Sequence, residues 1–143
     1  MKIMSGEEAV EVVLNKIKID ENRNEQVIVL KEKSGNRYLP VVIGIAEVNA
    51  IKLRLSGVEP PRPLTHDLLL RIIEGFGGKV KRILIDRLED STFFAKLVLT
   101  KNGSSGEFEI DARPSDSIAL ALRADAPIVV SPSVLDEAGI NGT

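Results

Sequence analysis

The sequence has no cysteine and only one histidine, His66, among its 143 residues. Without cysteine the chain can form no disulfide, iron–sulfur cluster or thiolate zinc site, and it has no thiol nucleophile. A single histidine excludes a zinc site built from several histidines of one chain. The first 13 residues contain three glutamates and no apolar stretch typical of an export signal, so we expect a cytoplasmic protein.

Aromatic residues are also scarce, with four phenylalanines, one tyrosine and no tryptophan. Proteins that bind single-stranded nucleic acid usually stack the bases on aromatic side chains. The net charge of −2 gives no general attraction for a polyanion. We therefore expect any contact with nucleic acid to be local and to involve the phosphates. No apolar run approaches the ~18 residues of a membrane span, so we expect no membrane partner.

The composition that remains, 43% hydrophobic and 28% charged, is typical of a folded protein. The length fits one domain over residues 1–143. Hydrophobic alternation, buried apolar runs and turn signals predict strands at Val12–Ile19, Gln26–Lys33, Tyr38–Ile43, Val80–Asp86, Phe93–Thr100, Glu107–Ala112 and Pro127–Val130. Helical spacing predicts helices at Ile45–Leu55, from Thr65 to the glycines after Phe76, at Ser115–Arg123, and from Ser131 or Ser133 to near Gly139.

This order of elements predicts an α+β fold, with helices packed on a mainly antiparallel or mixed sheet. The two parts of the chain, residues 12–78 and 79–139, follow a similar plan of three strands and then helices. Apolar positions also align at an offset of 67 residues, so that Val13 matches Val80 and Ile43 matches Ile110. An internal duplication explains this pattern, and two unrelated halves with similar periodicity explain it equally well.

Two segments repeat the same arrangement of residue types, Arg62–Asp67 and Arg113–Ser117. Each has an arginine, then a proline, then a hydroxyl residue at a predicted helix start, with a carboxylate close behind. We expect the hydroxyl to cap the first turn and the carboxylate to lie at the positive end of the helix dipole. Helix-start chemistry of this kind needs no ligand, and it remains an alternative to any functional role.

The functional interpretation of the two segments is a phosphodiester site. Free amides at a helix start and the planar fork of an arginine both suit phosphate oxygens, which assigns phosphate binding to Arg62, Thr65, Arg113 and Ser115. A first-turn position favours the neutral form of His66, which would then act as a general base near neutral pH. Asp67 and Asp116, with Glu47 as a third ligand, are candidates for holding Mg²⁺ or Mn²⁺.

Other polar clusters have simpler explanations. Glu107, Glu109 and Asp111 alternate along one predicted strand, where they are metal ligands or, more simply, a solvent-facing side. Lys79, Lys81 and Arg82 form the local basic cluster of the chain, and they contact phosphate or border a sheet. The phosphate loop, the dinucleotide-binding glycine motif, the serine-hydrolase elbow and the zinc-protease motif are all missing from the sequence.

Four segments together resemble the bifunctional nuclease domain family: Leu39–Gly44 with Glu47, Pro61–Leu70, Asp111–Leu120 and Ala126–Ser131. The resemblance extends over roughly residues 12–138. It implies an α+β fold, cleavage of both DNA and RNA, and self-association, with a homodimer as the expected form. Its motif positions include the residues of the two arginine–proline segments. The alternative is a module of the same fold that binds a protein or an anionic ligand without catalysis.

Overall fold

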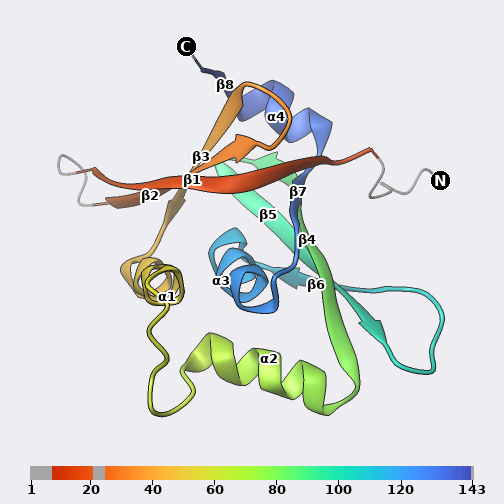
Figure 1. Cartoon of the computed structure of the whole chain (residues 1–143). Helices are drawn as coiled ribbons and strands as arrows, with labels where there is room; N and C mark the ends of the chain where they lie inside the picture. The colour runs from red at the N-terminus through yellow and green to blue at the C-terminus, as the bar shows by residue number, and fades with distance from the viewer. Residues whose placement is uncertain (1–7, 21–24, 143) are drawn as a thin grey trace.

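The computed structural model describes residues 8–20 and 25–142 (Figure 1). Its strands are β1 (Val10–Asp20), β2 (Glu25–Glu32), β3 (Arg37–Ile43), β4 (Gly78–Glu89), β5 (Thr92–Lys101), β6 (Phe108–Ala112), β7 (Ile128–Val130) and β8 (Ile140–Asn141). Its helices are α1 (Ile45–Leu55), α2 (Thr65–Gly75), α3 (Pro114–Ala124) and α4 (Pro132–Ala138). The four helices and seven longer strands lie where the sequence patterns predict them.

The eight strands form one sheet in the order β6-β5-β4-β7-β1-β2-β3-β8. Two antiparallel three-stranded units, β1–β3 and β4–β6, lie on either side of the short strand β7. This strand pairs antiparallel with β1 and parallel with β4, so it joins the two units into a continuous sheet. The predicted α+β fold with a mixed, mainly antiparallel sheet is therefore confirmed. The internal duplication stays a prediction.

Helix α3 lies at the centre of the helical layer, between α1 and α2 on one side and strands β4 and β5 on the other (Figure 1). The consecutive residues from Ile118 to Ala121 are all buried. A helix that is apolar on every side belongs in the interior of the protein, because it has no polar face to present to water. The small alanines allow its neighbours to approach closely. None of the helices in the described ranges has the length and apolar character of a membrane span.

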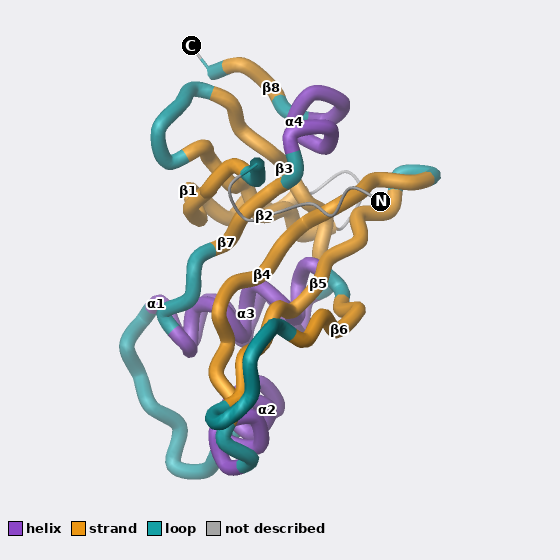
Figure 2. Tube along the Cα trace, turned by 90° about the vertical axis from the view of Figure 1, so that its right-hand side faces the viewer, coloured by secondary structure: helices purple, strands orange, loops and turns teal. Residues whose placement is uncertain are grey.

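Helix α2 lies at the end of the sheet that is far from α4 and β8 (Figure 2). Its apolar residues recur at helical spacing along one side, but most of that side faces outward. Ile73 packs against the core, whereas Leu68, Leu69 and Ile72 are 40–50% exposed and Phe76, just after the helix, is 80% exposed. Helical periodicity identifies an apolar face without saying what covers it.

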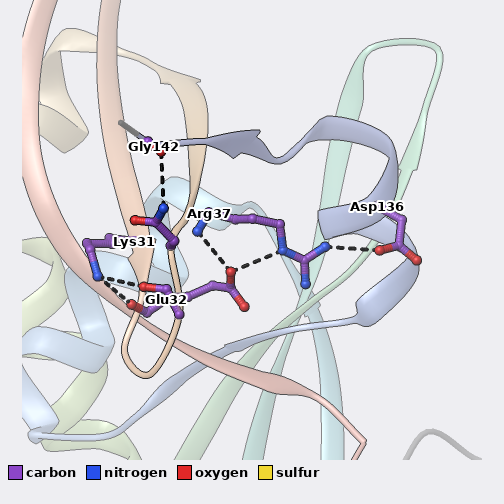
Figure 3. Close-up of polar contacts among 7 residues, drawn as sticks. Lys31, Glu32, Arg37, Asp136 and Gly142 are labelled. Atoms are coloured by element: carbon purple, nitrogen blue, oxygen red, sulfur yellow. Dashed lines mark hydrogen bonds and ion pairs between the residues drawn. The ribbon is translucent and has the colours of Figure 1, made fainter.

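The short strand β8 has no sequence pattern of its own, and polar contacts hold it beside β3 (Figure 3). Gly142 donates its backbone N–H to the Asn36 carbonyl at 2.8 Å and accepts from the Asn36 side-chain amide at 3.1 Å. Arg37 donates to Glu32 Oε1 and to Asp136 Oδ1, each at 3.0 Å. These contacts link the β2–β3 hairpin to α4 and to the end of the chain.

Helix α1 offers a matched test of how much its buried face stabilises the fold. Ile51 is fully buried and Ile45 is 59% exposed on the same helix. We expect Ile51→Ala to lower the free energy of unfolding by about 2–5 kcal/mol, because it leaves a cavity in the core. Ile45→Ala should change it by no more than about 0.5 kcal/mol. Urea denaturation measures both, and equal effects would contradict the observed packing of α1.

Candidate active site

The starts of α2 and α3 meet in space, although they are about fifty residues apart in the sequence. Nε2 of His66, in the first turn of α2, lies 2.9 Å from Oδ1 of Asp116, in the first turn of α3. The two arginine–proline segments therefore converge, an arrangement that the sequence left open. A cleft of about 800 Å³ opens beside this contact, between the two helix starts and α1. Glu47, His66, Arg113 and Asp116 line its polar end.

Asp116 connects a histidine and an arginine through its two carboxylate oxygens. Oδ1 faces His66, while Oδ2 accepts hydrogen bonds from Arg113 Nε at 3.0 Å and Arg113 Nη2 at 2.8 Å. Partial burial acts to raise the pKa of Asp116, but the hydrogen bonds from His66 and Arg113 outweigh it and the net pKa lies below the usual value of 3.8. Asp116 is therefore ionised at neutral pH.

The ionised state of Asp116 decides the hydrogen-bonding roles of the His66 ring. A carboxylate only accepts hydrogen bonds, so Nε2 of His66 carries a proton and donates it. In the neutral imidazole, Nδ1 is then the nitrogen with the free lone pair. The side chain of His66 is 9% exposed. Among the described residues Nδ1 has no hydrogen-bond partner, and His66 is one of the residues that line the cleft.

Arg113 is the exposed cation of the cleft, with 68% of its side chain accessible. Besides Asp116 it contacts Glu47, whose Oε1 lies 3.3 Å from Arg113 Nη2. The guanidinium itself stays open to solvent, although the side chains of Glu47 and Asp116 are only 12% and 33% exposed. An incoming anion can therefore compete with both carboxylates for the guanidinium of Arg113.

The other predicted phosphate ligands lie in different surroundings. Thr65 lines the cleft and is exposed, whereas Ser115 is buried with 6% of its surface accessible. Arg62 is exposed on the connector before α2, and the described contacts give it no hydrogen bond or ion pair. The cleft thus includes Thr65 and Arg113 of the predicted set, and does not include Arg62 or Ser115 among its lining residues.

The predicted capping by hydroxyl groups is wrong at both helix starts. The N-cap residues are Leu64 for α2 and Arg113 for α3, and neither helix has a side-chain cap from Thr65 or Ser115. A hydroxyl caps a helix from the residue just before it, but both hydroxyl residues already lie inside the first turn. At α2 the carboxylate takes a capping role instead, because Asp67 Oδ2 accepts the backbone N–H of Leu64 at 2.9 Å.

Asp67 does not join the other two predicted metal ligands. Its Oδ1 accepts a hydrogen bond from Arg123 Nε at 2.7 Å, and it lines a separate pocket of about 300 Å³ on the other side of Pro63. Glu47 and Asp116 both contact Arg113 instead of a shared space for a cation. Within residues 8–20 and 25–142 no group of three or more ligating side chains is arranged to hold a metal. The predicted three-carboxylate set is therefore not assembled.

Arg123 is a residue that sequence reasoning missed. Only 4% of its side chain is exposed, and besides Asp67 it donates to the carbonyls of Ala119 and Ala50. It thereby connects α1, α2 and α3. The signal was an arginine within an otherwise Ala- and Leu-rich buried helix, where a charged side chain needs partners. Burial acts to raise the pKa of Asp67, but hydrogen bonds from Leu64 and Arg123 outweigh it and the net pKa is lowered.

Comparison with known proteins confirms the family resemblance. The model of the bifunctional nuclease domain matches residues 28–143. The chain belongs to this family. It is 44% identical over 124 residues to an uncharacterized protein of Mycobacterium tuberculosis strain H37Rv, a match that covers 87% of this chain and 73% of that protein. All the site residues named above fall within residues 28–143, the range that the family model matches.

Plant members of the family are more distant. The chain is 30% identical over 124 residues to bifunctional nuclease 2 of Oryza sativa subsp. japonica, covering 85% of this chain and 38% of the plant protein. It is 30% identical over 107 residues to bifunctional nuclease 1 of Arabidopsis thaliana, covering 73% of this chain and 33% of that protein. The chain thus spans only about a third of the length of these plant nucleases.

The Asp67–Arg123 pair gives a prediction about stability and pH. We expect Asp67→Ala to lower the free energy of unfolding at neutral pH by about 3 kcal/mol, because it leaves the buried guanidinium of Arg123 unpaired. The folded-state pKa of Asp67 lies below the ordinary 3.8, so its contribution is present above that pH and is lost as the pH falls through the folded pKa. The difference between wild type and variant should therefore shrink below pH 3.8.

Glu137, which is exposed on α4, provides the control. Glu137→Ala should match the wild type in urea denaturation across the same pH range. A constant difference between wild type and Asp67→Ala, from neutral to strongly acidic pH, would show that the carboxylate does not act through its charge.

Proposed function

We propose that this domain hydrolyses phosphodiester bonds in DNA and RNA, with His66 as the general base. The observation that carries the proposal is the hydrogen bond between His66 and Asp116 at a cleft where Arg113 is exposed. Membership of the bifunctional nuclease domain family supports it, as do the names of the plant relatives. The proposal transfers the activity named for those longer proteins to this chain.

His66 would activate a water molecule through Nδ1, the ring nitrogen that has no partner among the described residues. As Nδ1 takes the proton from water, the ring becomes a cation, and the carboxylate of Asp116 beside Nε2 stabilises that charge. Asp116 also fixes the orientation of the ring. It keeps its own negative charge throughout, as its lowered pKa favours. The proton on Nδ1 can then pass to the leaving oxygen.

Arg113 would bind the scissile phosphate. Its guanidinium offers a planar set of donors that matches two phosphate oxygens, and 68% of its side chain is exposed, so an incoming phosphate can reach it. Thr65, at the edge of the cleft, would add a hydroxyl donor. Arg62 would contact a neighbouring phosphate from the connector, whereas the burial of Ser115 argues against direct contact.

Dependence on Mg²⁺ or Mn²⁺ stays a prediction, as does cytoplasmic localisation. Glu47 and Asp116 are the two carboxylates of the cleft that remain as candidate ligands, and both are paired with Arg113 in this structure. We derive no catalytic step through a metal, since the described carboxylates form no ligand set. The activity of EDTA-treated protein, with and without added Mg²⁺ or Mn²⁺, measures the dependence directly.

We also propose that the protein is a homodimer through an exposed apolar surface, which we call the α2–β6 patch. It consists of Leu68, Leu69, Ile72, Phe76, Phe108 and Ile110, which are 40–80% exposed. One shallow apolar pocket is lined by Ile72, Phe76, Phe108 and Ile110, so α2 and β6 contribute to a continuous surface. We estimate that its apolar area is on the order of 500 Å² per chain. A standard interface buries about 800 Å² per partner, somewhat over half of it apolar, so one patch supplies the area that a dimer needs.

The nuclease proposal predicts which variants lose activity. His66→Ala should lower kcat on single-stranded DNA and on RNA by at least about 100-fold, the usual contribution of a general base. Asp116→Asn should lower kcat by at least about 10-fold. The neutral amide disturbs the orientation of the His66 ring and cannot stabilise the positive charge that forms on it. Arg113→Ala should chiefly weaken substrate binding. Steady-state cleavage of fluorescent oligonucleotides by nuclease-free preparations measures all three.

Glu137→Ala, far from the cleft on α4, is the control for each preparation. If His66→Ala retains the full wild-type rate after the same purification, the activity belongs to a contaminant or to another site. In that case binding without turnover would favour the alternative function, a module that recognises an anionic ligand or a protein.

The dimer proposal predicts a change of mass in sedimentation velocity. The wild type should sediment at twice the monomer mass, and Phe76→Glu should shift it to the monomer, because it places a charge in the apolar interface. Val42, 58% exposed on β3, lies outside the patch, so Val42→Glu should leave the dimer intact. A wild type that is monomeric at every concentration tested would contradict the proposal.

A further inference from the structure

The candidate cleft has two chemically different parts. Its polar end holds the charged groups described above, and its remaining wall is mostly apolar. Helix α1 contributes Ala46, Ala50 and Leu53 to this wall, and the connector before α2 contributes Pro63 and Leu64. A cleft for phosphate alone has no need of an apolar wall, because phosphate oxygens are bound by charges and hydrogen bonds.

Leu64 is held in place at the mouth of the cleft. Its backbone N–H is bound by Asp67 Oδ2 at 2.9 Å, and its carbonyl accepts the N–H of Leu68 at 2.8 Å. Pro63, with its fixed φ, precedes it. Its side chain is nevertheless 43% exposed. An apolar side chain that stays exposed on a rigid backbone is suited to contact a ligand.

A nucleotide matches this division of the cleft. It has an anionic phosphate at one end and a base with apolar faces at the other, and about 800 Å³ lies within the range of small-ligand sites. In a duplex the base faces are stacked and covered, so only an unpaired or displaced nucleotide can place its base against Leu53, Pro63 and Leu64. The scarcity of aromatic residues suggested phosphate contacts alone, but aliphatic side chains can also pack on a base.

The charges around the cleft also disfavour a duplex. Duplex binding without base contacts depends on many lysine and arginine contacts to phosphates. Here the exposed Arg113 is balanced by Glu47 and Asp116, and the whole chain carries a net charge of −2. Because Arg113 is the single arginine or lysine among the lining residues of the cleft, contact with the base has to supply part of the affinity.

We infer that the cleft accepts an unpaired nucleotide of single-stranded DNA or RNA, with its phosphate at Arg113 and its base against Leu64. This rests on the proposed function, since it specifies the substrate of the same site. Few groups of the cleft can read a base edge, with Asn49 on α1 the neutral amide among its lining residues. Binding should therefore be largely tolerant of sequence.

The test measures binding in EDTA, separately from cleavage. The probe is a short end-labelled oligothymidylate, and the comparison is a blunt-ended duplex with strands of the same length and the same label. Fluorescence anisotropy should show at least about ten-fold tighter binding of the single strand. Leu64→Ser should weaken that binding about five-fold, which is the low end for loss of a base-stacking contact. Serine is a favourable N-cap residue, so this change leaves the start of α2 stable.

Leu55→Ser is the matched control, because Leu55 is 56% exposed at the end of α1 and does not line the cleft. It should bind oligothymidylate as the wild type does. The inference is overturned if the blunt-ended duplex binds as tightly as the single strand, if Leu64→Ser binds normally, or if the oligothymidylate does not bind.

The outcomes also separate this inference from the nuclease proposal. His66→Ala should keep the binding of oligothymidylate and lose cleavage. Cleavage that depends on His66 together with equal binding of both probes would leave the nuclease proposal standing and remove this inference. If single-strand binding depends on Leu64 but no cleavage depends on His66, this inference about the ligand stands and the nuclease proposal is removed.

Discussion

The candidate site depends on how the first turn of α2 is fixed against α3. Two consecutive residues make that connection: Asp67 pairs with the buried Arg123 at 2.7 Å, and His66 contacts Asp116 at 2.9 Å. Arg123 also donates to the carbonyl of Ala50, so the same guanidinium holds α1. A buried charge tolerates little displacement, because a lost partner leaves it unpaired in a medium of low dielectric constant. The cleft between the three helices is shaped by this constraint.

The carboxylates near the site have separate tasks that follow from their surroundings. Asp67 serves the fold, with one oxygen on a helix-start amide and the other on a buried arginine. Asp116 serves the cleft, since it orients His66 and competes with any anion for Arg113. Both have lowered pKa values, because hydrogen bonds to the ionised form outweigh the cost of burial. Asp67 and Asp116 thus occupy similar positions in the two arginine–proline segments but have different hydrogen-bond partners and different roles.

Much of the secondary structure was predictable, because it follows from local patterns. Helix α1 matches its predicted bounds, and the strands around the β2–β3 hairpin differ from theirs by a residue or so. The caps were mispredicted because α2 has Leu64 as its N-cap and α3 already begins at Pro114, so that Thr65 and Ser115 fall inside the first turn. Strand β8 was missed because its two residues are held by pairing with β3, at Arg37 and Tyr38, which lie about a hundred residues earlier in the chain.

By itself, the sequence determined the order and type of the elements, the family resemblance and the chemical groups available for a site. Periodicity and turn residues are local signals that extend over a few neighbouring positions, so a single sequence is enough to identify them. Only the tertiary structure decided that β7 lies between β1 and β4, that His66 meets Asp116, that Asp67 faces Arg123, and that the apolar face of α2 remains exposed. These outcomes depend on which distant surfaces pack together, and that choice is made by the burial of the whole core.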